Sequence, residues 1–123
     1  MEYFSIDEFR CKCCNELPED GMNQILLDKL DDMRGRIGTP IIVTCGYRCP
    51  SHNAEVGGVP NSQHVLGNAA DIYCDSLSVD ELAGYCVEEG FDGIGRYYNS
   101  GFVHCDVRDN GDSPNYYTWT DQD

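Results

Sequence analysis

The stretch Ser62-Gln-His64-Val-Leu-Gly-Asn-Ala-Ala-Asp71 decides the chemistry of this chain, and Phe102-Val-His104-Cys-Asp106 complements it. Two imidazoles and one carboxylate are donors that bind zinc, and a site with three protein ligands leaves the fourth tetrahedral position open for water. The chain has only three histidines, and two of them lie in these stretches. We therefore expect His64, Asp71 and His104 to bind one catalytic Zn²⁺ ion.

The surrounding pattern predicts the α+β class, with a small antiparallel sheet and flanking helices. Apolar periodicity, β-branched runs, a Ser78–Glu81 capping box and a hairpin signal mark the elements. The expected helices cover 21–37, the start of 51–63 and the segment from Ser78 to Gly90; the expected strands cover 41–45, 69–74, 93–98 and 101–107.

We expect a single domain over 1–123, with a cysteine-containing N-terminal segment (1–19) and a polar tail (109–123). In this tail, Tyr116, Tyr117 and Trp119 are predicted either to cover the core or to line a groove.

Charge and hydropathy exclude several classes of partner. Acidic residues outnumber basic ones by 22 to 8, which gives a net charge of −14. We therefore expect neither nucleic acid nor an anionic membrane as a partner, because phosphate binding needs a basic face. The chain has no apolar run long enough for membrane insertion. Its first residues lack the features of a secretory signal, so we expect synthesis in the cytoplasm.

Strand alternation adds a second carboxylate to the predicted site. Asp106 follows His104 by two residues, so both side chains should point to the same face of the sheet. Asp106 is our candidate for the general base that accepts a proton from water. The alternative is that it orients a metal ligand.

These motifs resemble those of the M15 zinc peptidases. The matching residues are Ser62-x-His64-x-x-Gly-x-Ala-x-Asp71, Phe102-Val-His104-x-Asp106-x-Arg108 and Gly46-Tyr-Arg48-Cys-Pro-x-His-Asn53. The resemblance runs from about residue 4 to 109 and favours the branch of zinc D-Ala-D-Ala carboxypeptidases and phage cell-wall lysins. It implies the hedgehog/DD-peptidase fold.

The resemblance assigns roles to individual residues. His64, Asp71 and His104 match the family's zinc ligands. Arg48 matches an arginine that binds the substrate or its developing oxyanion, and a guanidinium suits both. Ser62 is expected to support the metal or a substrate carboxylate. One position departs from the pattern: several members carry an acidic base three residues before the last ligand, where this chain has Gly101.

The eight cysteines leave three alternatives open. Cys11, Cys13 and Cys14 could join Cys45 or Cys49 in a second, structural zinc site, but their spacing matches no recognised zinc motif. Disulfides and plain thiols are the other interpretations, and we expect only the catalytic ion. Cys74, Cys86 and Cys105 are predicted to be core residues.

The favoured function is hydrolysis of peptide bonds in peptidoglycan stem peptides or cross-bridges, of the D-Ala-D-Ala carboxypeptidase or endopeptidase type. The family resemblance further implies a phage or prophage lysin that acts on the cell wall after release. A zinc-binding module of the same fold without activity is the alternative, supported by Gly101. A cysteine-based redox or zinc-storage protein is a third hypothesis. The sequence does not determine the bond that is cut or the oligomeric state.

Overall fold

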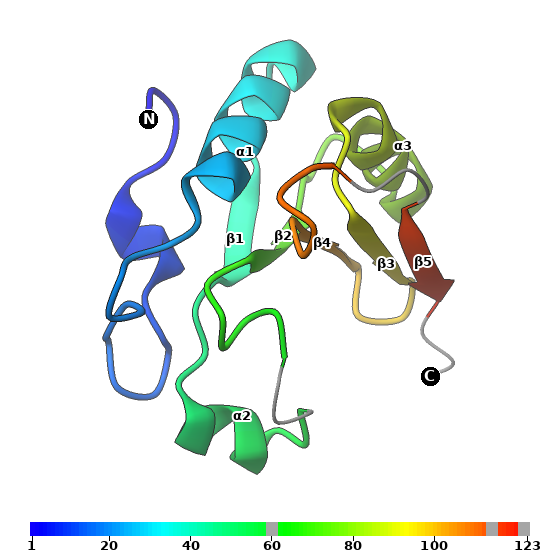
Figure 1. Cartoon of the computed structure of the whole chain (residues 1–123). Helices are drawn as coiled ribbons and strands as arrows, with labels where there is room; N and C mark the ends of the chain where they lie inside the picture. Colours follow the sequence, from blue (N-terminus) through cyan, green and yellow to red (C-terminus); the bar gives the residue numbers. More distant parts are fainter. Residues whose placement is uncertain (59–61, 113–115, 121–123) are drawn as a thin grey trace.

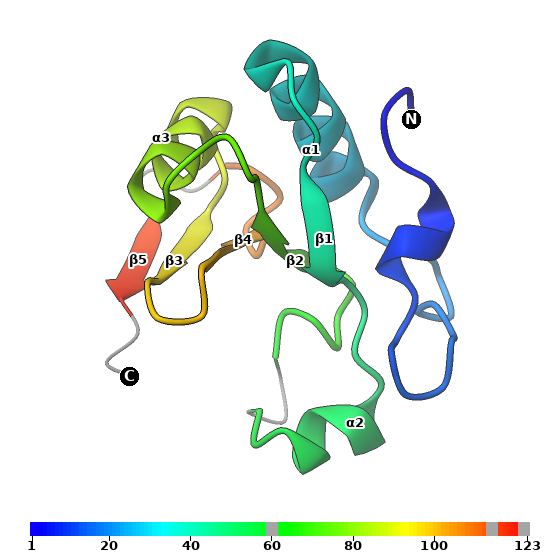
Figure 2. The same cartoon turned by 180° about the vertical axis from the view of Figure 1, so that it is seen from behind.

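The computed structural model describes residues 1–58, 62–112 and 116–120. Its elements form one five-stranded sheet with two larger helices on one side (Figures 1 and 2). In chain order they are the 3-10 helix η1 (Ile6–Phe9), α1 (Gln24–Ile37), β1 (Ile42–Cys45), α2 (Pro50–Glu55), β2 (Ala69–Tyr73), α3 (Val79–Glu89), β3 (Gly93–Tyr97), β4 (Phe102–Asp106) and β5 (Tyr117–Thr120).

The strands lie in the order β1-β2-β4-β3-β5. The pairs β1–β2, β2–β4 and β4–β3 are antiparallel, which confirms the predicted α+β class and its antiparallel sheet. Strand β5 is an addition that the sequence did not predict, and it pairs with β3 in parallel. The segment expected to be a polar tail therefore contributes an edge strand. No helix in the described part of the chain combines the length and the apolar character needed to cross a membrane.

The helix boundaries follow from local capping. Asn23 accepts a hydrogen bond from the backbone N–H of Ile25 at the start of α1, and Gly38 ends the helix in the left-handed conformation. Helix α3 begins with the predicted capping box: Ser78 Oγ accepts from Glu81 N at 3.1 Å, while Glu81 Oε1 accepts from Ser78 N at 2.9 Å. These bonds satisfy amide groups that have no partner within the helix.

The sheet has one apolar and one polar face. On β2 and β4, Ala70, Ile72, Val103 and Cys105 belong to the buried core that also contains side chains of α1 and α3. Their neighbours in sequence point to the opposite face, because strand side chains alternate. The predictions that Cys74, Cys86 and Cys105 are core residues are confirmed. The core thus fixes the sheet on one side and leaves the other available for a site.

The N-terminal segment packs directly against the loop that follows β1. Phe9 is fully buried, and its backbone O accepts a hydrogen bond from Tyr47 N at 2.8 Å. A Cβ atom added to Gly46 would lie only 2.7 Å from Cα of Phe9, so the two backbones meet where only glycine fits. The conformation of this loop therefore depends on residues near the start of the chain.

Candidate active site

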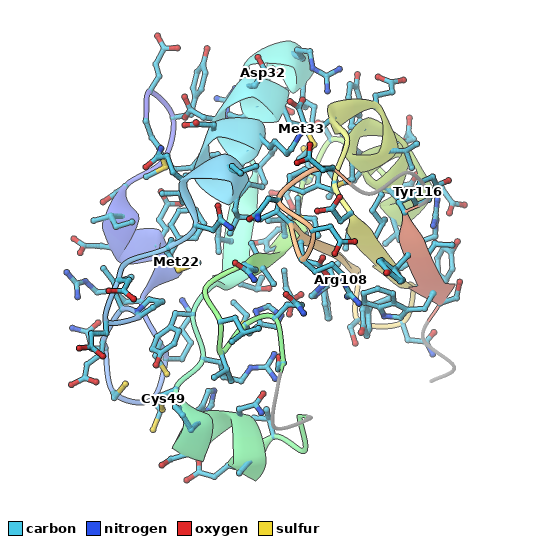
Figure 3. All side chains as sticks on the ribbon, viewed as in Figure 1. Met22, Asp32, Met33, Cys49, Arg108 and Tyr116 are labelled. Carbon is cyan, nitrogen blue, oxygen red and sulfur yellow. The ribbon has the colours of Figure 1, made fainter. Side chains whose placement is uncertain are left out.

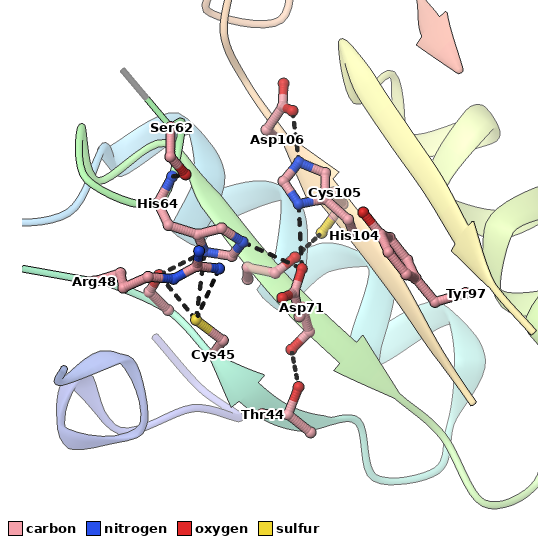
Figure 4. A network of polar contacts seen from close by, with 12 residues as sticks. Thr44, Cys45, Arg48, Ser62, His64, Asp71, Tyr97, His104, Cys105 and Asp106 are labelled. Atoms are coloured by element: carbon pink, nitrogen blue, oxygen red, sulfur yellow. Dashed lines mark hydrogen bonds and ion pairs between the residues drawn. The ribbon is translucent and has the colours of Figure 1, made fainter. Parts of the chain in front are cut away.

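The polar face of the sheet brings the three predicted metal ligands together (Figure 4). Asp71 on β2 lies directly opposite His104 on β4, and Asp71 Oδ1 is 3.1 Å from His104 Nδ1. His64 reaches the same carboxylate oxygen from the loop before β2, with its Nε2 atom 3.2 Å away. All three residues are buried. One carboxylate oxygen thus lies between two imidazole nitrogens that come from separate elements.

Local hydrogen bonds orient His64. Its backbone N–H donates to Ser62 Oγ at 3.2 Å, and its Nδ1 lies 2.8 Å from the backbone O of Gly46. A carbonyl oxygen only accepts, so Nδ1 carries the proton in this contact and Nε2 is left facing Asp71. Arg48 N also donates to His64 O at 3.2 Å. Ser62 thereby acts on the backbone of a predicted ligand.

Asp106 lies behind His104 and is fully buried. Its Oδ2 atom is 2.7 Å from His104 Nε2 and 2.7 Å from Arg108 Nη2, while its Oδ1 accepts from Arg108 Nε at 2.9 Å. A carboxylate that accepts from the outer nitrogen of a histidine fixes the ring and its tautomer. This geometry favours the orienting role of Asp106 over its role as base.

Two glycines on β3 make room for these groups. Gly93 lies opposite Asp106, and a Cβ atom there would lie 2.2 Å from Asp106 Oδ2. Gly95 lies between His104 and Trp119, and its Cβ would lie 2.5 Å from the indole. The rings of His104 and Trp119 approach to 5.0 Å across this position. The sequence Gly93-Ile-Gly95 is therefore a strand feature, as predicted, and it provides space for the site.

Hydrogen-bonded partners shift the pKa values of His64, Asp71 and Asp106 toward their charged forms. Burial alone would lower the pKa of His64, but its hydrogen bond with Asp71, reinforced by Cys45, raises the pKa to about 10. Burial also disfavours the ionised form of Asp71, yet hydrogen bonds from His104 and His64 hold its pKa well below the usual range. For Asp106, hydrogen bonds with His104 and Arg108 overcome burial in the same way and lower its pKa. Both carboxylates are therefore ionised at neutral pH.

The ligand cluster lies in the wall of a pocket of about 500 Å³. Arg48 and Ser62 line it, and Arg48 is held by a hydrogen bond from Nη1 to Asn53 Oδ1 at 3.0 Å. The described residues that line it are Arg48, Val56, Ser62, Gln63, His64, Asp71, Tyr97, Phe102, His104, Arg108 and Trp119. Among the described residues of this lining, Asp71 is the only carboxylate.

Six lining residues received no catalytic, binding or metal role from the sequence, namely Val56, Gln63, Tyr97, Phe102, Arg108 and Trp119. Trp119 Nε1 donates to Tyr97 Oη at 3.0 Å, and the Tyr97 ring stacks on Phe102 at 4.4 Å. The sequence left open whether Trp119 covers the core or lines a groove. In the structure Trp119 lines the pocket. Arg108 was part of the quoted motif, but only the structure shows its ion pair with Asp106.

The donor set fits a zinc ion. Two imidazole nitrogens and one carboxylate oxygen form a typical catalytic zinc site with an open position. The outer nitrogen of each imidazole is engaged, by Gly46 O in His64 and by Asp106 in His104, as is usual for metal ligands. Cys45 Sγ also lies within 4.8 Å of ligand atoms of His64 and Asp71, but the ring nitrogen that it contacts, at 3.6 Å, is Nδ1, which faces Gly46 O. His64 Nε2, Asp71 Oδ1 and His104 Nδ1 are therefore the atoms placed to hold the ion.

Comparison with known proteins agrees with this geometry. The chain is 41% identical over 64 residues to the zinc D-Ala-D-Ala carboxypeptidase of Streptomyces albus G, and this match covers 51% of the chain and 25% of that protein. It is 30% identical over 89 residues to the peptidoglycan L,D-endopeptidase MepK of Escherichia coli strain K12, over 67% of the chain and 49% of MepK.

The chain thus spans half or less of the length of these relatives. The sequence profile of the peptidase M15 family, in contrast, matches nearly all of it, from residue 2 to 106. That range includes the three candidate ligands, Arg48 and Asp106. The chain therefore belongs to the peptidase M15 family.

Proposed function

We propose that this chain is a zinc-dependent peptidase that hydrolyses peptide bonds in the stem peptides or cross-bridges of peptidoglycan. The observation that carries the proposal is the convergence of His64, Asp71 and His104 on one side of a pocket that also contains Arg48. The names of the two relatives support the substrate class, since one is a D-Ala-D-Ala carboxypeptidase and the other a peptidoglycan endopeptidase.

In this proposal some residues bind the ion or the substrate, and others hold the metal ligands in place. His64 Nε2, Asp71 Oδ1 and His104 Nδ1 would hold the ion, and zinc in such a site supplies Lewis acidity toward a carbonyl oxygen and a water molecule. Arg48 places a permanent positive charge at the pocket, where it binds a substrate carboxylate or a developing oxyanion. Ser62 keeps the backbone of His64 in place through its hydroxyl.

In this proposal Asp106 is a positioning residue rather than the general base. Its two oxygens are already engaged by His104 and Arg108, and it is fully buried. Its contact with Nε2 keeps the proton on that nitrogen and leaves Nδ1 of His104 as the donor toward the ion. Gly101 lies in the hairpin loop with a φ of 77°, a conformation that favours glycine over an acidic residue. This explains why the chain departs from the family pattern at that position.

A second candidate function is a zinc-binding module of the same fold without hydrolytic activity. The observation that favours it is the lining of the pocket, whose described residues include no carboxylate besides Asp71. A peptidase of this kind usually needs a group that accepts a proton from the attacking water. The two functions make different predictions for purified protein, because both bind zinc but only one releases products.

The deciding experiment incubates zinc-loaded protein with purified peptidoglycan and with defined muropeptides, and identifies the products by mass spectrometry. The peptidase proposal predicts new peptide fragments or released D-alanine, which also reveals the bond that is cut. Chelator-treated protein and the His104→Ala variant are the controls and should release neither. Zinc binding without products from any of these substrates would refute the peptidase and favour the binding module.

The proposal includes a site of action at the cell wall, reached after release from a producing cell as in a phage or prophage lysin. The peptidoglycan chemistry of the relative MepK supports this placement. Adding the purified protein to permeabilised bacteria tests it. A fall in turbidity that depends on zinc and on His104 supports the lysin role, whereas intact walls in the presence of an enzyme active on muropeptides would contradict it.

A further inference from the structure

A cluster of thiols lies outside the pocket, where the N-terminal segment passes the start of α2. The Sγ atoms of Cys11, Cys14 and Cys49 lie within 4.8 Å of one another. Cys49, labelled in Figure 3, precedes α2 directly, while Cys11 and Cys14 belong to the segment after η1. The fold therefore brings together cysteines from two segments that are distant in the sequence.

Backbone amides point at the sulfur atoms of this thiol cluster. Cys49 N donates to Cys11 Sγ at 3.3 Å, and His52 N donates to Cys49 Sγ at 3.4 Å. Hydrogen bonds from amides stabilise a negatively charged sulfur, which is the form that binds metal.

Cys13 supplies a fourth thiol. Its thiol is exposed and lies in the turn between Cys11 and Cys14. The same sulfur lies within 4.8 Å of ligand atoms of His52 and Glu55. Together with the sulfurs of Cys11, Cys14 and Cys49, the sulfur of Cys13 would complete the four protein ligands of a structural zinc site, which is tetrahedral and closed. Without a cation, several ionised sulfurs at this distance would repel one another.

We propose that Cys11, Cys13, Cys14 and Cys49 bind a second, structural zinc ion. This differs from our expectation of a single ion, because the spacing of these cysteines alone matched no known zinc motif. The fold adds what the spacing does not show, namely that Cys49 lies beside Cys11 and Cys14. Cys45, the other partner considered from the sequence, lies instead beside His64.

The position of this ion suggests what it does. Residues 46–49 connect β1 to the thiol cluster, and they include Gly46, whose O accepts from His64, and Arg48, which lines the pocket. The ion would hold this connection against the N-terminal segment, next to the close contact between Phe9 and Gly46. Zinc bound in this way contributes directly to folding free energy. The ion would thus fix the pocket wall that carries Arg48.

The experiment measures zinc per chain by plasma mass spectrometry after purification of the full chain without chelators. The proposal predicts two ions in the wild type and one in the double variant Cys14→Ser/Cys49→Ser. Serine also caps helices, so the start of α2 keeps an oxygen in place of the Cys49 sulfur. Cys74→Ser is the matched control, since Cys74 is a core thiol outside the cluster, and it should retain two ions.

A measurement on the unmutated cluster keeps the proposal testable if the double variant does not fold. Cobalt is substituted for zinc in the His104→Ala variant, in which the peptidase site lacks a ligand. Absorption from thiolate-to-cobalt charge transfer is expected, together with protection of four cysteines from alkylation. A disulfide within the cluster, a wild-type chain with one ion that the double variant retains, or four freely alkylated thiols in the presence of zinc would each overturn the proposal.

Discussion

The imidazole of His104 is held from both sides, by Asp71 at Nδ1 and by Asp106 at Nε2. Such an arrangement fixes both the orientation of the ring and the nitrogen that carries the proton. Asp106 is itself held by Arg108, so a chain of three charged or polar groups ends at the proposed metal. Replacement of Asp106 can distinguish whether this residue orients His104 or acts as the general base.

Replacement Asp106→Asn is expected to lower zinc affinity by about 10- to 100-fold, because the weaker acceptor no longer fixes His104. Peptide release should then recover substantially at saturating zinc. Competition with a chromogenic chelator measures the affinity, and product formation at increasing zinc measures the recovery. Asp75→Asn, at an exposed position, is the matched control and should behave as wild type. Normal zinc affinity with activity lost at every zinc concentration would instead identify Asp106 as the base.

Replacement of Arg48 tests its proposed role in binding the substrate. Its guanidinium lines the pocket and is held by Asn53, so it meets the substrate with little loss of conformational freedom. Removal of a charged donor of this kind costs roughly 10²-fold in rate. Steady-state kinetics of Arg48→Ala on a muropeptide should show such a loss in kcat/KM with unchanged zinc content. Arg10→Ala, which removes an exposed ion pair with Asp7, serves as control, and equal kinetics of the two variants would exclude Arg48 from the site.

At the scale of elements, the site depends on a strand that contributes no ligand. Strand β3 lies between β4 and β5, and its two glycines face Asp106 and Trp119. Side chains at these positions would occupy the space of the carboxylate and the indole. Strand β3 therefore contributes to the site by leaving space for the Asp106 carboxylate and the Trp119 indole.

Gly93→Ala is expected to destabilise the fold by about 1–3 kcal/mol, since the new methyl group overlaps Asp106 in a buried region. Gly84→Ala in α3 is the matched control: no atom lies within 4 Å of its added Cβ, and the change should stabilise the helix by about 0.5–1 kcal/mol. Urea unfolding followed by circular dichroism measures both. A Gly93→Ala protein as stable as wild type would show that Asp106 is not fixed in this position.

The elements that could be predicted are those with strong local signals. The apolar period over 21–37, the capping box at Ser78 and the alternation at His104 and Asp106 each depend on nearby residues. Strand β5 carries only a short Tyr-Thr-Trp-Thr run, and its pairing with β3 joins segments more than twenty residues apart. A parallel edge strand of this kind has no hairpin signal, which is why Trp119 entered the site only in the structure.

At the scale of the whole molecule, the ligand trio could be predicted because its spacing is a family pattern. The thiol cluster was only one of several alternatives in the sequence, because the position of Cys49 beside Cys11 and Cys14 follows from the packing of Phe9 under the loop after β1. The ion pair of Arg108 with Asp106 was also not predicted. The two residues are close in the sequence, but burial of the pair depends on the sheet. The thiol cluster and the buried Arg108–Asp106 pair therefore depend on long-range packing, which local sequence patterns do not reveal.

The whole molecule should lose stability in acid. The pKa values of Asp71 and Asp106 are lowered in the folded state, so their contribution is complete above the unfolded value of about 4 and is lost as pH falls below it. For metal-free protein we expect a loss of about 2 kcal/mol in unfolding free energy between pH 6 and pH 3. Relief of repulsion among 22 acidic residues acts in the opposite direction.

Urea titrations of the metal-free wild type and of Asp106→Asn separate these two effects, because the variant keeps the general repulsion and lacks one titrating carboxylate. The variant should show a smaller loss between pH 6 and pH 3. An identical pH dependence in both proteins would mean that Asp106 keeps its ordinary pKa in the folded state, which would contradict its contacts with His104 and Arg108.

The most direct test of the central claim is anomalous diffraction at the zinc edge from crystals of the chain purified with zinc. The account predicts a peak bonded to His64 Nε2, Asp71 Oδ1 and His104 Nδ1 at about 2.0–2.2 Å, with the pocket side of the ion open to solvent. Absence of a peak among these three side chains, in crystals that hold zinc elsewhere, would contradict it.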